Sequence, residues 1–191
     1  EYSFWLSDRN GNGRFDDYAE IRAMGQMAMG PAPLSVEGDY IFLTDRPKKE
    51  TAIVQPSDAQ PLGNYLLLGS QIFEVKIDLP KGKMIFTEMK TGLGSLTLPV
   101  KTDRISLYSE TGPKVVTAYK PSGDALMLPP GNYKLLSYQV FRKDGQGDLW
   151  RLSASGSGES PMVTVSPGGK ASFNVCEPFT PVVALPSTGS A

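Results

Sequence analysis

The sequence has 191 residues, of which 40% are hydrophobic and 20% charged, so it has the composition of a globular chain and is long enough to bury a core. Nineteen Lys and Arg residues are interspersed with twenty Asp and Glu residues, and this balance argues against nucleic acid as a partner. The chain contains no histidine, which removes Ser-His-Asp and Cys-His catalytic sites and His-based zinc sites. Since no pair of carboxylates is marked out either, we expect the chain not to be an enzyme.

No apolar run approaches the roughly 18 residues that a membrane-spanning helix needs, so we expect no membrane span. The chain opens at Glu1 without a signal peptide, as a mature secreted chain would. The single cysteine, Cys176, cannot form an internal disulfide, and we expect it to be a small buried apolar residue.

The first unit, residues 1–33, is expected to contain a strand, a loop and a short helix. Residues 2–7 alternate Tyr2, Phe4 and Leu6 against Ser3, Trp5 and Ser7, which predicts a strand with one strongly apolar face. A loop follows over residues 8–17, and the apolar spacing of residues 16–29 predicts a helix that Gly30 and Pro31 end.

The loop carries oxygen-bearing side chains at alternate positions. Asp8, Asn10 and Asn12 stand at positions one, three and five of a twelve-residue frame, with Gly13 at position six. This spacing resembles the calcium loops of EF-hands, including those of dockerins and other secreted bacterial modules. The resemblance implies calcium as cofactor and an extracellular location. The candidate metal ligands are Asp8, Asn10, Asn12, the backbone carbonyl of Arg14, Asp16, Asp17 and Glu20.

The loop departs from the EF-hand pattern at its end. Position twelve is Ala19, and Glu20 comes one residue late, so either Asp16 or Asp17 completes the site or Glu20 reaches back. Because two of the side chains are neutral, we expect a dissociation constant of about 10⁻⁴–10⁻³ M. The alternative is an Asx-rich turn that is stabilised only by its own hydrogen bonds.

The remainder of the chain is expected to be all-β. Short apolar-alternating segments with frequent turn signals predict a β-sandwich, built either as one composite unit or as two packed modules, residues 34–101 and 102–177. Residues 178–191 are Pro-rich and are expected to form an extended tail. Strands are expected at residues 35–44, 73–79, 83–89, 96–100, 104–109, 114–120, 125–128, 132–141, 148–155, 161–166 and 170–175.

Residues 124–135, DALMLPPGNYKL, resemble the Pro-Pro-Gly turn of transthyretin-like and Cna-B-like sandwich modules of secreted bacterial surface proteins. The resemblance implies a β-sandwich over residues 102–177 with Tyr133 buried at the start of a strand. Such modules serve as stalks, carriers and adhesin spacers. The Glu that promotes an isopeptide bond in the Cna-B pattern is missing from residues 137–139, so we expect no such cross-link. The LPSTG match at residues 185–189 is interpreted as a chance match in the Pro-rich tail.

We expect an extracellular structural or assembly protein of the cell surface, either a filament subunit or a spacer. Its expected partner is a second copy of itself, joined by strand addition. The alternative is a carbohydrate- or protein-binding module, which would need exposed aromatic residues; Trp5 and Trp150 are candidates but are expected in the core. A hydrolase with an unusual site is the third hypothesis. The candidate assembly residues are Tyr2, Phe4, Leu6, Val182, Val183 and Leu185.

Overall fold

The computed structural model describes residues 3–24, 32–44, 59–68, 71–98, 102–110, 115–119 and 125–173. Within these ranges the regular elements are β-strands and one 3₁₀ turn, Leu79–Lys81, so the expected all-β class is confirmed. No helix in the described part of the chain is long and apolar enough to cross a membrane. The predictions for Tyr2, for residues 25–29 of the expected helix, for Cys176 and for the tail at residues 178–191 fall outside the described residues.

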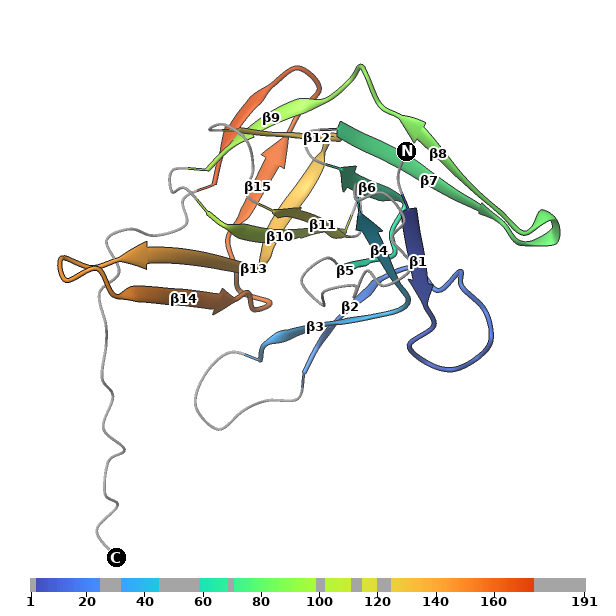
Figure 1. Cartoon of the computed structure of the whole chain (residues 1–191). Coiled ribbons are helices and arrows are strands. Elements are labelled where there is room, and N and C mark those ends of the chain that lie inside the picture. Colours follow the sequence, from blue (N-terminus) through green and yellow to red (C-terminus); the bar gives the residue numbers. More distant parts are fainter. Residues whose placement is uncertain are drawn as a thin grey trace, which may run out of the picture.

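The described strands form five sheets (Figure 1). They are β1 (Ser3–Ser7), β4 (Tyr40–Thr44) and β5 (Ala59–Pro61) in the first sheet; β2 (Glu20–Ala23) and β3 (Leu34–Glu37) in the second; β6 (Tyr65–Leu68), β7 (Gln71–Asp78) and β8 (Lys83–Glu88) in the third; β9 (Gly94–Thr97), β12 (Ala125–Leu128) and β16 (Lys170–Ser172) in the fourth; and β10 (Arg104–Ser109), β11 (Val115–Tyr119), β13 (Gly131–Lys143), β14 (Leu149–Ser155) and β15 (Met162–Val165) in the fifth.

The helix expected from residue 16 onward is wrong over its described part, residues 16–24. Strand β2 occupies this stretch and pairs antiparallel with β3, from Glu20 opposite Glu37 to Ala23 opposite Leu34. Just before it, the buried Ala19 donates its N–H to the carbonyl of Leu62 at 2.7 Å. These main-chain bonds to distant segments outweigh the weak helical periodicity of the sequence, which Gly25 already interrupts.

The single strand expected over residues 35–44 is two strands, β3 and β4, with Gly38 and Asp39 between them. Gly38 has a φ of 110°, and a Cβ placed there would lie 2.9 Å from the backbone oxygens of Asp17 and Tyr18. Only glycine fits such a position. The break brings Asp39 against the loop of residues 8–17, which matters for the candidate site.

The main core draws on both halves of the chain. Its residues come from the third, fourth and fifth sheets and the segments next to them. They are Leu67, Ile72, Leu96, Leu98, Ile105, Leu107, Val116, Ala118, Leu126, Leu128, Tyr133, Val165 and Phe173. Tyr133 is fully buried, as expected, and its hydroxyl donates to the carbonyl of Pro129 at 2.6 Å. The Pro-Pro-Gly turn is therefore tied to the core by a buried hydrogen bond.

The hairpin of β13 and β14 projects from the fifth sheet (Figure 1). Strand β10 pairs with β13 only as far as Gln139, so the last four residues of β13 extend past it, with β14 beside them. Trp150 lies on this projection and is 60% exposed, and Trp5 on β1 is 39% exposed. The expectation that both tryptophans belong to the core is wrong, because each lies in a strand at the margin of its sheet.

Candidate functional site

The candidate site is the loop of residues 8–17, which leaves β1 and leads to β2. Both ends of this loop are tied to one buried carboxylate. The backbone N–H of Arg9 donates to Oδ1 of Asp39 at 3.3 Å, and that of Asp17 donates to Oδ2 at 3.1 Å. Asp39 has no exposed surface. Sequence reasoning missed its role, although the Gly38-Asp39 break inside an apolar run was the available signal.

The environment of Asp39 disfavours its negative charge. Burial raises the pKa of Asp39, the two N–H donors oppose that rise, and the carboxylates of Asp17 and Asp8 add to it. The carboxylates of Asp8, Asp17 and Asp39 therefore repel one another when all three are ionised. A bound cation would reduce the repulsion among these three carboxylates.

Asp8 organises the first half of the loop. Its Oδ1 accepts the N–H of Gly11 and its Oδ2 accepts the N–H of Gly13, both at 2.7 Å. Each glycine has a positive φ, 70° at Gly11 and 77° at Gly13, and this conformation turns the backbone around the Asp8 carboxylate. Each carboxylate oxygen keeps a further lone pair that can bind a cation.

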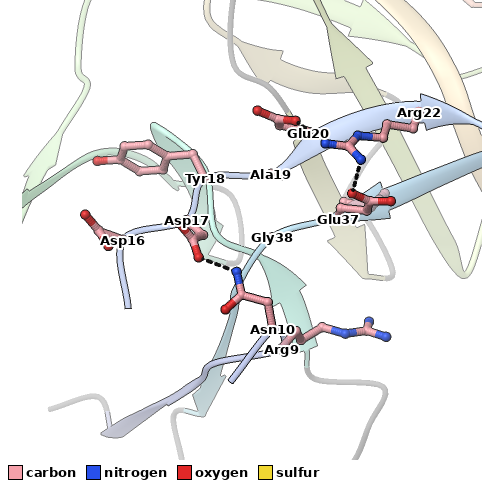
Figure 2. A pocket seen from close by; sticks show the side chains of 11 residues that line it. Arg9, Asn10, Asp16, Asp17, Tyr18, Ala19, Glu20, Arg22, Glu37 and Gly38 are labelled. Atoms are coloured by element: carbon pink, nitrogen blue, oxygen red, sulfur yellow. Dashed lines mark hydrogen bonds and ion pairs between the residues drawn. The ribbon is translucent and has the colours of Figure 1, made fainter. Parts of the chain in front are cut away.

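Asn10, Asn12 and Asp17 converge in the same loop. The side-chain amides of Asn10 and Asn12 both donate to Oδ2 of Asp17, each at 2.7 Å, and Figure 2 shows the Asn10–Asp17 contact. The amide oxygens of Asn10 and Asn12 accept the N–H groups of Asn12 and Arg14, at 3.0 and 2.7 Å. The structure thus brings together four of the predicted ligands: Asp8, Asn10, Asn12 and Asp17.

Two other predicted ligands have different partners. The guanidinium of Arg14 binds both carboxylate oxygens of Asp16, at 3.0 and 2.7 Å, and this hydrogen bonding lowers the pKa of Asp16. Glu20 lies on β2 and accepts a hydrogen bond from Arg22 at 3.2 Å; in Figure 2 it points away from Asn10. The structure therefore does not place Asp16 or Glu20 with Asp8, Asn10, Asn12 and Asp17.

The four residues that come together here offer oxygen ligands of the kind that a hard cation prefers, but only two of them carry a negative charge. Among the described residues, no three His, Cys, Asp or Glu side chains are grouped so that they could hold a metal. A site here must add the amide oxygens of Asn10 and Asn12 to the carboxylates of Asp8 and Asp17. Oxygen donors of this mixed kind suit calcium better than zinc. An open pocket of about 680 Å³, lined in part by Asn10, Asp17 and Gly38, lies beside them (Figure 2).

Of the candidate assembly residues, Phe4 and Leu6 lie on β1. This strand pairs along its whole length with β4, from Ser3 opposite Thr44 to Ser7 opposite Tyr40. One side of β1 is therefore already paired within its own chain. Phe4 also packs edge-on against Phe86, with ring centroids 6.0 Å apart. Val182, Val183 and Leu185 lie outside the described residues.

Comparisons of the chain with family models, with curated proteins and with solved structures found no match.

Proposed function

We propose that this chain is an extracellular structural or assembly protein, either a surface filament subunit or a spacer in a surface protein, that calcium stabilises. The observation that carries the proposal is the convergence of Asp8, Asn10, Asn12 and Asp17 in one loop. Both ends of that loop are tied to Asp39. The transthyretin-like and Cna-B-like turn supports a β-sandwich of the kind used in stalks and spacers.

Calcium supplies positive charge at this loop. It neutralises the carboxylates of Asp8 and Asp17, whose charges add to the rise in the pKa of the buried Asp39. The loop is the covalent link between β1 and β2, so ordering it also orders the direction in which β1 leaves the body. Extracellular calcium is plentiful enough to fill a site of the expected affinity.

Assembly is supported by the position of β1. Among the described strands it is the end member of the β1-β4-β5 sheet, and Phe4 and Trp5 on it are exposed. Edge strands with apolar side chains favour pairing with another chain. The pairing of β1 with β4 shows which side of the strand is already used.

A second candidate function is favoured by the exposure of Trp150. Its indole N–H donates to Oδ2 of Asp144 at 2.8 Å, which fixes the ring while leaving much of it open. A fixed, exposed aromatic ring is what a carbohydrate- or protein-binding module uses for recognition. A ligand whose binding is lost in Trp150→Ala, in a chain that stays monomeric with calcium, would favour this candidate.

The test of the proposed function is assembly with calcium and with a chelator, followed by negative-stain imaging and light scattering. We expect calcium to promote ordered assembly of the intact chain, and Asp17→Asn to reduce it. Glu20→Gln is the matched control, because Glu20 pairs with Arg22 and not with the loop. A chain that stays monomeric in both conditions, or assembles equally in both, would contradict the proposal.

A further inference from the structure

The outward edge of β14 is the feature that carries a further inference. Two main-chain bonds that flank the β13–β14 ladder show which of its residue pairs are hydrogen-bonded. The N–H of Asp144 donates to the carbonyl of Asp148, and the N–H of Gly156 donates to that of Leu136. In an antiparallel pair, alternate residues exchange both of their hydrogen bonds. The even-numbered residues of β14 therefore bond to β13. The residues whose N–H and C=O point away from β13 are Leu149, Arg151, Ser153 and Ser155.

In the part of the chain that the structure describes, no strand pairs with this edge and no backbone hydrogen bond reaches these groups. The start of β3 contacts the chain just past the end of β14, where Pro33 bridges Ser157 and the N–H of Leu34 donates to the carbonyl of Gly156 at 3.3 Å. The side chains of the strand are also open, since Leu149 is 65% exposed and Trp150 is 60% exposed. A seven-residue edge with open backbone groups and exposed apolar side chains is a site for strand addition.

We propose that a second copy of this chain pairs antiparallel along β14, with the two Leu152 residues facing each other on a two-fold axis. In this register Leu149 lies opposite Ser155 and Arg151 opposite Ser153. In both pairs the backbone N–H and C=O groups of each residue point away from β13, so the two copies can exchange hydrogen bonds. All seven residues of β14 take part, and no charged residue faces a like charge.

The neighbouring registers are less favourable. Moving the axis to Arg151 places the two guanidinium groups directly opposite each other, and like charges in that position are destabilising. Moving it to Ser153 leaves Leu149 and Trp150 outside the paired segment. An axis shift by half a residue would pair outward-facing residues with inward-facing ones and lose the hydrogen bonds.

The side chains match in the same register. Trp150, Leu152 and Ala154 lie on one face of β14, because alternate residues of a strand share a face. Pairing about Leu152 sets each Trp150 against the small Ala154 of the other copy, with the two Leu152 residues between them. This forms one apolar stripe across the joint. The bond from the Trp150 indole to Asp144 already orients the ring, which reduces the entropy lost on association.

The inference rests on the proposed function, because it takes the chain to act as an assembly. It adds a partner, a second copy of the chain, and a surface, the outward edge of β14. A two-fold joint of this kind is closed by itself. If a second contact formed through β1, the end strand of its sheet, the dimers would join into a filament whose subunits alternate in direction.

Charge substitutions on the axis test the proposal, measured by sedimentation velocity over a concentration series in calcium. We expect the wild-type chain to dimerise, and Leu152→Lys and Leu152→Glu each to weaken dimerisation at least about tenfold, because like charges then face each other. Mixing the two variants should restore association. Only residues that face themselves across the axis can give this result.

A surface variant covers the case in which charge at Leu152 disturbs folding. Ser153 is exposed and faces Arg151 of the other copy, so Ser153→Glu should tighten association and Ser153→Lys should weaken it. The matched control is Ile85→Lys, an exposed apolar position on β8, which should leave dimerisation unchanged. Circular dichroism confirms that each variant is folded.

The outcomes separate this inference from the proposed function. A wild-type chain that is monomeric at every concentration, with and without calcium, overturns both. Calcium-dependent assembly that Leu152→Lys and Ser153→Lys leave unchanged overturns the β14 contact alone. Dimerisation that both variants weaken equally with and without calcium supports the β14 contact and counts against calcium control of assembly.

Discussion

Replacing Asp39 with alanine should destabilise the fold and loosen the candidate calcium loop together. The carboxylate of Asp39 is fully buried and accepts the N–H groups of Arg9 and Asp17, which stand at the two ends of the loop. Asp39→Ala leaves both donors without an acceptor. Each lost bond costs about 1–3 kcal/mol, and part of this is recovered because a buried charge has been removed.

The expected net loss is therefore about 2–3 kcal/mol, which lowers the melting temperature by about 4–12 °C in a chain of this size. Asp39→Asn keeps one acceptor oxygen and should lose less, about 1 kcal/mol at neutral pH. Differential scanning calorimetry and urea denaturation in the presence of a chelator measure both variants without a contribution from calcium.

The pH dependence of the Asp39→Asn variant provides a separate check. Burial raises the pKa of Asp39, so the folded chain takes up a proton at a higher pH than the unfolded chain. The wild-type chain should gain stability relative to Asp39→Asn as the pH falls from 7 towards 4, the gain being complete below the unfolded pKa. The reasoning would be refuted if the difference in stability between the wild-type chain and Asp39→Asn stayed constant or narrowed as the pH fell. It would also be refuted if Asp39→Ala lowered the free energy of unfolding by less than about 0.5 kcal/mol.

Three further outcomes are expected. Tyr133→Phe should cost about 1–2 kcal/mol in urea denaturation, because the buried carbonyl of Pro129 loses its hydroxyl partner; an unchanged midpoint would contradict this. Gly38→Ala should cost at least about 2 kcal/mol, since the positive φ and the contacts with two backbone oxygens both disfavour a side chain; a neutral result would mean that the break is mobile. The hydrogen bond from the Trp150 indole is the main reason why the pKa of Asp144 is lowered, so this bond contributes stability above the ordinary Asp pKa and is lost as the pH falls through the lowered value. The fluorescence of Trp150, recorded with Trp5 replaced by Phe, should change in that acid range and lose this change in Asp144→Asn.

Local patterns predicted the second half of the chain well. Strands β10 and β12 have the expected bounds, and the turn at residues 144–148 joins β13 and β14 as a hairpin. Strand β12 alternates between buried and exposed positions, whereas β10 is buried on both faces, and Asp, Gly or Pro residues flank both strands, so the information lies within a few residues.

Non-local contacts account for what the sequence could not predict. Strand β2 forms because β3 pairs with it. The apolar spacing of residues 16–29 gave no information about that pairing, because β3 lies outside this segment. The exposure of Trp150 follows from the short reach of β10, whose pairing with β13 stops at Arg104 opposite Gln139. The role of Asp39 depends on a contact with a loop 22 residues earlier, as the Asp17 bond shows. In the loop itself, spacing selected Asp8, whereas local ion pairs two residues apart, Arg14 with Asp16 and Arg22 with Glu20, engage the other two carboxylates.

The most direct test of the central claim is the melting temperature of the wild-type chain and of Asp17→Asn with and without calcium. For a dissociation constant of about 10⁻⁴–10⁻³ M, about 10 mM calcium stabilises the wild-type fold by about 1.4–2.7 kcal/mol, or about 3–11 °C. Asp17→Asn should lose most of this rise, whereas Glu20→Gln should keep it. A wild-type melting temperature that calcium leaves unchanged, or a rise that Asp17→Asn retains in full, would contradict the account.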